Sequence, residues 1–142
     1  MKKTVAEGTA LMTQDDLMTI MYKHWKWLKF DGGEKADLSY RDLRGLNLKG
    51  FVLQRVNFQD ANLSGMCLYE CDFSNANLRN TDFSNADLRR AIFIRAALKG
   101  VILDGANIRT ACFSSARFAD VLKGMDTSTC RKFSRKLHGV QL

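Results

Sequence analysis

Residues 77 to 88, NLRNTDFSNADL, read almost the same when the stretch is shifted along itself by five positions. An α-helix does not fit this period, because a step of five residues turns the side chain by about 500°, or about 140° beyond a full turn, and spreads the large residues over every face. An uninterrupted strand does not fit either, since an odd step sends successive large residues to opposite sides. The period therefore predicts short extended segments separated by corners.

The five-residue period continues far beyond this stretch. It covers seventeen consecutive quintets, each with Leu, Ile or Phe at its centre. The central residues are Leu38, Leu43, Leu48, Leu53, Phe58, Leu63, Leu68, Phe73, Leu78, Phe83, Leu88, Phe93, Leu98, Leu103, Ile108, Phe113 and Phe118. The residue two places before the centre is small or apolar in most quintets, and the residue just before the centre is Asp or Asn in ten of them. The repeating motif is therefore A(D/N)LXX.

A coil with four sides satisfies this motif. The central residue and the residue two places before it point inward, the Asp or Asn points outward, and the last two residues turn the corner. Stacked at the inter-strand spacing, such coils would form a solenoid roughly 20 Å tall. The pattern predicts a column of Leu53, Phe73, Phe93 and Phe113 along one inner side. It also predicts that the Asp and Asn side chains bond to the backbone of the corners.

The seventeen tandem motifs resemble those of the pentapeptide repeat protein family. The resemblance covers residues 36 to 120 and implies an all-β solenoid, a right-handed quadrilateral β-helix of about four coils. It leaves the function open, because the repeat residues are structural and the family is functionally diverse.

The first 35 residues contain the pattern of a capping helix. Thr13 resembles an N-cap with acidic residues in the first turn, and Asp31, Gly32 and Gly33 end the helix. The expected helix spans about residues 14 to 29, with an apolar face that consists of Leu17, Met21, Trp25 and Leu28 and with Met18 beside it. Packing on the first coil is the expected role, and contact with a membrane or a partner is the alternative. This helix and the following GGEKADLS resemble the N-terminal region of bacterial and prophage-encoded family members.

The C-terminal segment, residues 121 to 142, is basic. It holds five Lys or Arg residues and one acidic residue, and so contributes +4 to the net charge of +7. A short helix that covers the last coil is expected, with its basic side in solvent. Contact with an acidic partner or with nucleic acid is the alternative for this tail. The candidate contact residues are Arg131, Lys132, Arg135 and Lys136.

The sequence contains no pattern typical of catalysis, so we expect no enzyme activity, no cofactor and no metal site. The four cysteines lack paired spacing, which predicts free thiols, and His24 is expected on the helix surface or at its cap. Because no long apolar run or leader peptide is visible, a cytoplasmic protein without membrane contact is expected.

Departures from the motif suggest an interface on the coil, because the repeat itself predicts polar residues at these outer positions. Apolar residues replace them at several places, and basic residues lie around these in the sequence. The candidate interface residues are Ile92, Ile94, Ile102, Arg89, Arg90, Arg95 and Lys99. An exposed apolar patch with a basic rim predicts a protein-binding surface, and coverage by a flank or by a second copy is the alternative.

These features predict a non-enzymatic scaffold that binds a protein, and a homodimer is compatible with them. The prophage resemblance implies a host protein as the target of inhibition or modulation. The family's best-known activity, binding of DNA gyrase by acidic rods that resemble duplex DNA, is the first alternative. The charge of residues 36 to 120 is +2, with eleven basic and nine acidic residues, and disfavours such mimicry. Weak nucleic-acid binding through the tail is the second alternative.

Overall fold

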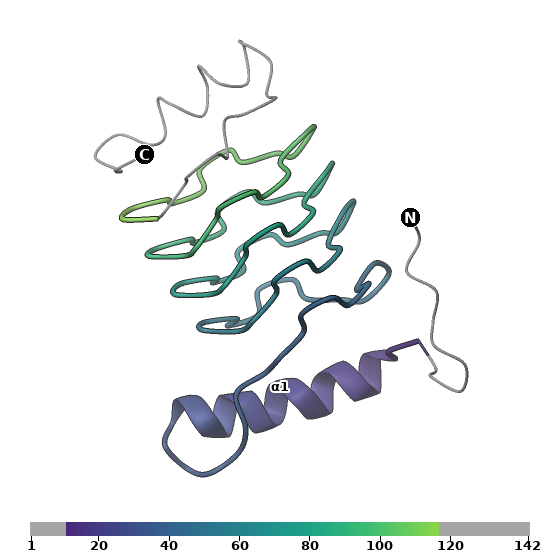
Figure 1. Cartoon of the computed structure of the whole chain (residues 1–142), viewed down its shortest axis with the longest axis vertical. Helices are drawn as coiled ribbons and strands as arrows, with labels where there is room; N and C mark the ends of the chain where they lie inside the picture. The colour runs from purple at the N-terminus through teal and green to yellow at the C-terminus, as the bar shows by residue number, and fades with distance from the viewer. Residues whose placement is uncertain (1–10, 117–142) are drawn as a thin grey trace. The chain divides into compact units, whose positions relative to one another are not determined.

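The computed structural model describes residues 11 to 116. They fall into two compact units, with the boundary between Ala36 and Asp37. The first unit contains the helix α1 and the loop after it, and the second is the coil (Figure 1). The predicted tail contacts, Arg131, Lys132, Arg135 and Lys136, lie outside the described residues.

Helix α1 spans Gln14–Leu28, close to the expected range. It begins with a capping box, in which the Thr13 hydroxyl oxygen accepts the Asp16 amide at 3.1 Å. The Asp16 carboxylate in turn accepts the Thr13 amide at 2.9 Å. This backbone hydrogen bond, joined by one from the Thr13 hydroxyl, lowers the pKa of Asp16. The helix therefore begins where its orphan N–H groups have local acceptors.

The buried face of α1 differs from the expected one. Leu17, Met21 and His24 are buried, whereas Trp25 is 51% exposed. The predicted surface position of His24 is therefore wrong, and so is the predicted burial of Trp25. His24 Nδ1 accepts the Ala36 amide at 3.0 Å, and its ring stacks on Trp27 at 5.5 Å. A buried backbone N–H needs an acceptor, and the imidazole supplies one that an indole cannot.

Parallel bridges between residues twenty apart define the coil. Each side contributes one bridging residue rather than a strand, and the bridges run, for example, from Val52 to Asp72, Ile92 and Cys112. All the bridging residues occupy the position just before a quintet centre. Four quintets therefore make one turn, and the turns stack as the rungs seen in Figure 1.

The four sides of the coil can be named by their central residues. Side 1 is centred on Leu38, Phe58, Leu78 and Leu98. Side 2 is centred on Leu43, Leu63, Phe83 and Leu103. Side 3 is centred on Leu48, Leu68, Leu88 and Ile108. Side 4 is centred on Leu53, Phe73, Phe93 and Phe113.

Every corner of the described coil contains a left-handed residue. The second residue after each centre has a positive φ at sixteen successive corners, and eleven of these residues are not glycine. Such a conformation costs a side chain about 1 kcal/mol. Bonds between rungs offset this cost. The Tyr40 amide donates to the Gln59 carbonyl at 2.9 Å, and the Asp60 amide donates to the Arg79 carbonyl at the same distance.

The Asp and Asn residues of the motif close these corners, as predicted. In all ten quintets that have one, its side-chain oxygen accepts the backbone N–H two residues later. The ten acceptors are Asp37, Asp42, Asn47, Asn57, Asn62, Asp72, Asn77, Asp82, Asp87 and Asn107. These bonds are 2.8 to 3.3 Å long. The outward position of the motif is therefore structural wherever it is Asp or Asn.

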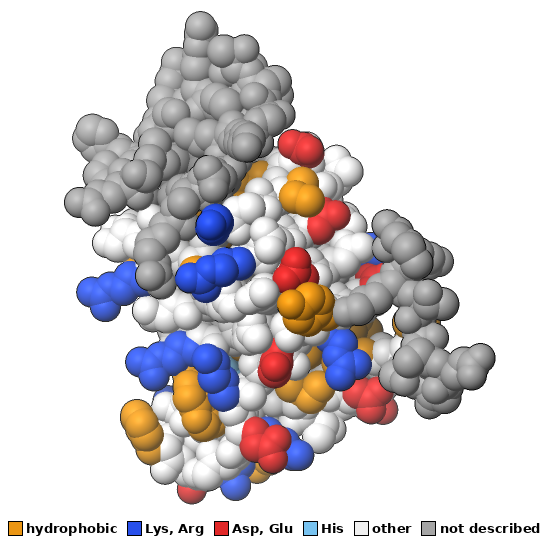
Figure 2. All heavy atoms as spheres, viewed as in Figure 1, with side chains coloured by type: hydrophobic (Ala, Val, Ile, Leu, Met, Phe, Trp, Pro, Cys, Tyr) orange, Lys and Arg blue, Asp and Glu red, His pale blue; other side chains and the backbone are white. Residues whose placement is uncertain are grey.

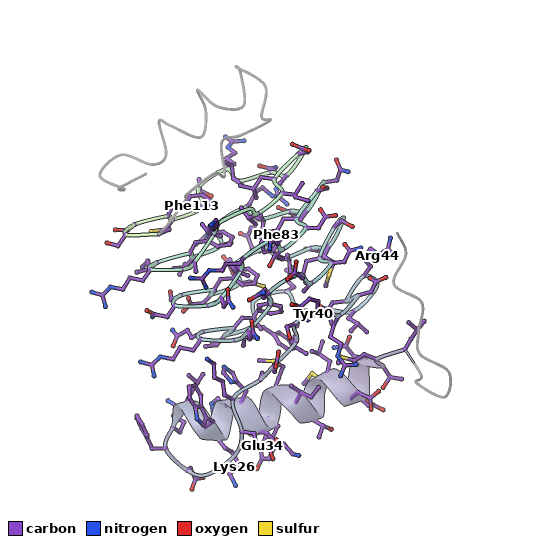
Figure 3. The ribbon with its side chains drawn as sticks, viewed as in Figure 1. Lys26, Glu34, Tyr40, Arg44, Phe83 and Phe113 are labelled. Atoms are coloured by element: carbon purple, nitrogen blue, oxygen red, sulfur yellow. The ribbon has the colours of Figure 1, made fainter. Side chains whose placement is uncertain are left out.

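Aromatic rings fill the inside of the coil. Phe93 stacks between Phe73 and Phe113, with ring centroids 5.1 and 4.8 Å apart. This confirms the predicted column on side 4. Phe83 on side 2 reaches the same column and meets Phe93 edge-on at 6.1 Å. Figure 3 labels Phe83 and Phe113 on the coil. Rings from two sides meet across the interior, so the coil has a packed core.

One buried thiol gives a first prediction. Cys71 is buried, its Sγ donates to the Leu48 carbonyl at 2.7 Å, and burial raises its pKa to about 11. Cys67 and Cys112 are exposed. We expect a thiol reagent at pH 8 to modify Cys67 and Cys112 at least about a hundredfold faster than Cys71, because the thiolate is the reactive form. Peptide mapping after a brief pulse separates these sites from Cys130. Comparable labelling of Cys71 would contradict its burial.

The same group makes the stability of the coil pH-dependent on the alkaline side. The folded thiol holds its proton more tightly than an unfolded thiol, whose pKa is about 8.5. The contribution is therefore complete below about pH 8.5 and decreases as the pH rises toward about 11.

Candidate functional site

The apolar candidate residues do not form one patch. Ile92 and Ile94 lie on side 4, whereas Ile102 lies ten residues further along, which is half a coil, on the opposite side 2. Ile92 is half-buried, and Ile94 and Ile102 are 37% and 40% exposed. On the face seen in Figure 2, hydrophobic side chains lie singly or in small groups among charged ones.

The basic candidate residues are also divided among the sides. Arg95 lies at the corner that ends side 4, and Lys99 lies on side 1. Arg89 lies on side 3, and Arg90 is the left-handed residue at the corner that ends it. Only Arg89 and Arg90 of the seven candidates belong to side 3.

Side 3 carries a column of basic and aromatic residues. Lys49, Tyr69, Arg89 and Arg109 occupy the same quintet position in successive rungs, twenty residues apart. Lys49 Nζ lies 5.7 Å from the centre of the Tyr69 ring, and Arg89 Cζ lies 5.5 Å from it. Arg90 Cζ lies 6.0 Å from the same ring, and its Nη1 donates to the Tyr69 hydroxyl at 3.4 Å. Three cations therefore surround one ring, which is a cation–π cluster.

Two carboxylates hold the arginines of this cluster in place. Arg89 donates to both oxygens of Asp87, at 2.8 and 2.7 Å, and Arg90 lies 3.3 Å from Glu70. The side-chain hydrogen bond from Arg89 is the main reason that the pKa of Asp87 is lowered. Exposed pairs of this kind add little to stability, but the bidentate contact fixes the orientation of the guanidinium. Side 3 holds four basic and two acidic residues, a formal charge of +2.

Side 2 has an arginine–aspartate pair equivalent to that of side 3, but it lacks the cation–π cluster. Arg44 donates to Asp42 at 2.9 and 2.7 Å, in the same quintet positions as Arg89 and Asp87. Figure 3 shows Arg44 on the outside of the coil. This side holds two basic and three acidic residues, so its formal charge is −1. The quintet positions that correspond to Tyr69 hold no aromatic residue on side 2.

Sequence reasoning did not find the side 3 column. The signal was present as residues 49, 69, 89 and 109, but a search along neighbouring quintets joins residues that point in different directions. The distance that matters is twenty residues, because only this step returns to the same side.

The described residues contain no group of three or more His, Cys, Asp or Glu side chains that could hold a metal ion. Within residues 11 to 116, no helix is both long enough and apolar enough to cross a membrane.

Comparison with known proteins connects this coil to one family. The family model for pentapeptide repeats, with eight copies of the repeat, matches residues 36–75, 67–105 and 83–120. A comparison with curated protein sequences finds no significant match.

Among solved structures, the chain is similar to HetL, a pentapeptide repeat protein involved in heterocyst differentiation regulation in the cyanobacterium Nostoc sp. strain PCC 7120. The identity is 32%, the TM-score is 0.49, and the match covers 60% of this chain and 37% of HetL. It therefore spans well under half of that protein.

Two further structures have lower similarity. A pentapeptide repeat protein from the thylakoid lumen of Arabidopsis thaliana is 24% identical over 71% of this chain and 72% of its own, with a TM-score of 0.42. QnrB1, a plasmid-mediated fluoroquinolone resistance protein, is 15% identical over 75% of this chain and 67% of its own, with a TM-score of 0.22.

Proteins with this repeat fold as right-handed quadrilateral β-helices and are generally non-catalytic scaffolds. The family model covers residues 36 to 120, which is more than half of the 142 residues, and the bridges at twenty-residue steps agree with four quintets per turn. The chain belongs to the pentapeptide repeat family.

Proposed function

We propose that the chain is a non-enzymatic scaffold that binds an acidic surface of another protein through side 3. The observation that carries the proposal is the Tyr69 ring with Lys49, Arg89 and Arg90 around it. Arginine and tyrosine are enriched at the centres of protein interfaces, because both combine a large contact area with polar groups. The packed interior supports binding on the outside rather than within the coil.

The charges of side 3 favour a protein partner over nucleic acid. Glu70 and Asp87 lie beside Arg90 and Arg89, and a surface that follows a phosphate backbone would meet both carboxylates. The ring of Tyr69 is already surrounded by cations, so it is not open to a stacked base. A protein surface with carboxylates and donors in alternation fits this mixed pattern better.

The second step of the proposal concerns the identity of the partner. We propose that it is a host protein, which this chain would inhibit or modulate. It rests on the resemblance of the N-terminal segment to prophage-encoded members. The likeness to QnrB1, with its TM-score of 0.22, adds no argument for DNA gyrase. The tail is a further candidate contact with the same partner, because four of the six residues from 131 to 136 are basic.

The test is an affinity pull-down from host lysate with nuclease present, using the full chain. We expect a protein that the wild type retains to be retained about tenfold less by the Arg89→Ala, Arg90→Ala double variant, since loss of charged anchors costs about 1–2 kcal/mol.

The control is Arg44→Ala, which removes the equivalent arginine from side 2. It should retain the partner at the wild-type level. Equal loss in both variants would assign the effect to overall charge. A protein that is captured only in a parallel sample without nuclease would contradict a direct protein partner.

A further inference from the structure

We propose that α1 forms the contact of an antiparallel homodimer, in which the helix of a second copy covers Met18, Tyr22 and Trp25. This inference goes beyond the scaffold function and does not depend on side 3. Met18 is 48% exposed, Tyr22 is 62% exposed and Trp25 is 51% exposed. The rings of Tyr22 and Trp25 stack with centroids 6.3 Å apart.

The exposed stripe is additional to the buried face of the helix. Leu17, Met21 and His24 already form the buried face of α1. A helix that needs only one apolar face has polar residues beside it. Here the neighbouring positions are instead two aromatic residues and a methionine, and large exposed apolar groups in a row are typical of an interface.

The spacing of the stripe is that of paired helices. Asp15, Met18, Tyr22, Trp25 and Lys29 follow one another by steps of three, four, three and four residues. This alternation keeps the side chains on one seam, as in a coiled coil. The stripe therefore has the geometry to pack along another helix rather than against a single point.

The charges at the two ends of the stripe select the partner. Asp15 lies seven residues before Tyr22, and Lys29 lies seven residues after it. Both side chains are exposed, and neither is in an ion pair within the described part of the chain. In an antiparallel pair centred on Tyr22, Asp15 of one copy faces Lys29 of the other, at both ends. A parallel pair would place like charges together, which is unfavourable.

The same charges argue against a membrane as the occupant. A helix that lies on an anionic surface has basic residues along the edges of its apolar face. Asp15 continues the apolar stripe at one end and Asp16 follows it, so an anionic surface would be repelled there. A second copy places its Lys29 against Asp15, whereas an anionic lipid surface offers Asp15 no cation.

The expected dimer is weak. Fifteen helical residues extend about 22 Å. A single helix pair of that length buries less than the roughly 800 Å² per partner of a standard interface. We therefore expect a dissociation constant in the micromolar range, with dimers that dissociate on dilution.

Sedimentation equilibrium of the full chain over a concentration series tests the proposal. We expect the wild type to pass from monomer to dimer, and Trp25→Glu to raise the dissociation constant at least about tenfold. The matched control is Ile102→Glu, which places the same charge at an exposed apolar position on the coil and should leave association unchanged. Circular dichroism shows whether each variant retains its helix.

A charge exchange makes the test independent of the aromatic residues. Asp15→Lys and Lys29→Asp should each weaken association, and the double exchange should restore it because the facing pairs are again opposite in charge. A wild type that stays monomeric at all concentrations would overturn the proposal. So would a dimer that survives both Trp25→Glu and Asp15→Lys, or a monomer that instead sediments with anionic vesicles.

Discussion

Replacement of Phe93 by alanine is expected to destabilise the coil by about 3–5 kcal/mol, the range for deletion of a large buried aromatic side chain. Phe93 is fully buried, is stacked between Phe73 and Phe113, and meets Phe83 edge-on. The backbone of each rung is bonded to the rungs on both sides, so the coil cannot easily collapse around the missing ring. The cavity would therefore remain largely open, which keeps the cost high.

Urea unfolding of the two proteins measures this effect as a shift of the midpoint. Ile94→Ala is the control. Ile94 directly follows Phe93 in the chain, but its side chain is 37% exposed, so its truncation should cost less than about 1 kcal/mol. A Phe93→Ala protein as stable as Ile94→Ala would contradict the packed interior. A change in slope instead of midpoint would indicate that rungs unfold separately.

The second large effect is expected at the loop after α1, where two adjacent glycines have different surroundings. Gly33→Ala should abolish the ordered first unit, whereas Gly32→Ala should cost only about 1 kcal/mol. Both residues have a positive φ, of 80° and 73°, so both substitutions cause backbone strain. Only at Gly33 would the added Cβ collide with the Lys23 carbonyl oxygen and approach the Trp27 nitrogen at 2.9 Å. Backbone atoms of a helix cannot move aside cheaply.

Amide hydrogen exchange can follow this difference at a defined position. The Ala36 amide donates to His24, and the Glu34 amide donates to the Lys23 carbonyl at 3.1 Å. We expect Gly33→Ala to remove protection at both amides and Gly32→Ala to retain it. Protection that survives in Gly33→Ala would show that the loop can approach α1 by another path.

Much of the coil could be predicted from the sequence, because a five-residue period has few physical solutions. The inward column of Leu53, Phe73, Phe93 and Phe113 follows from the twenty-residue turn, and the structure confirms it. The corner bonds of Asp and Asn follow from their local chemistry. Local rules repeated seventeen times reinforce one another, which explains why this part of the prediction was accurate.

The packing of α1 was less predictable. Hydrophobic periodicity places Trp25 inside and His24 outside, whereas the structure has the reverse. The deciding interaction joins residues twelve positions apart, since the Ala36 amide needs an acceptor once it is buried. No pattern within the helix contains that information. The expectation that α1 covers the first coil stays a prediction.

The surface was predicted least well, for a geometric reason. Ile92 and Ile102 appear neighbours in the sequence but belong to opposite sides, while Lys49 and Arg109 appear distant and belong to one column. A surface on a coil must be read in steps of twenty residues, so proximity along the chain is misleading.

The left-handed corners also have a consequence for how such a chain can change over generations. Each corner ends a quintet with a left-handed residue, so gain or loss of one whole quintet keeps a Leu, Ile or Phe at every inward centre, although it changes which of them stack. It would, however, turn every later quintet by a quarter revolution and bring new residues beneath the old ones. A single small deletion could thus dismantle the column around Tyr69 and assemble a different surface, without one amino-acid substitution.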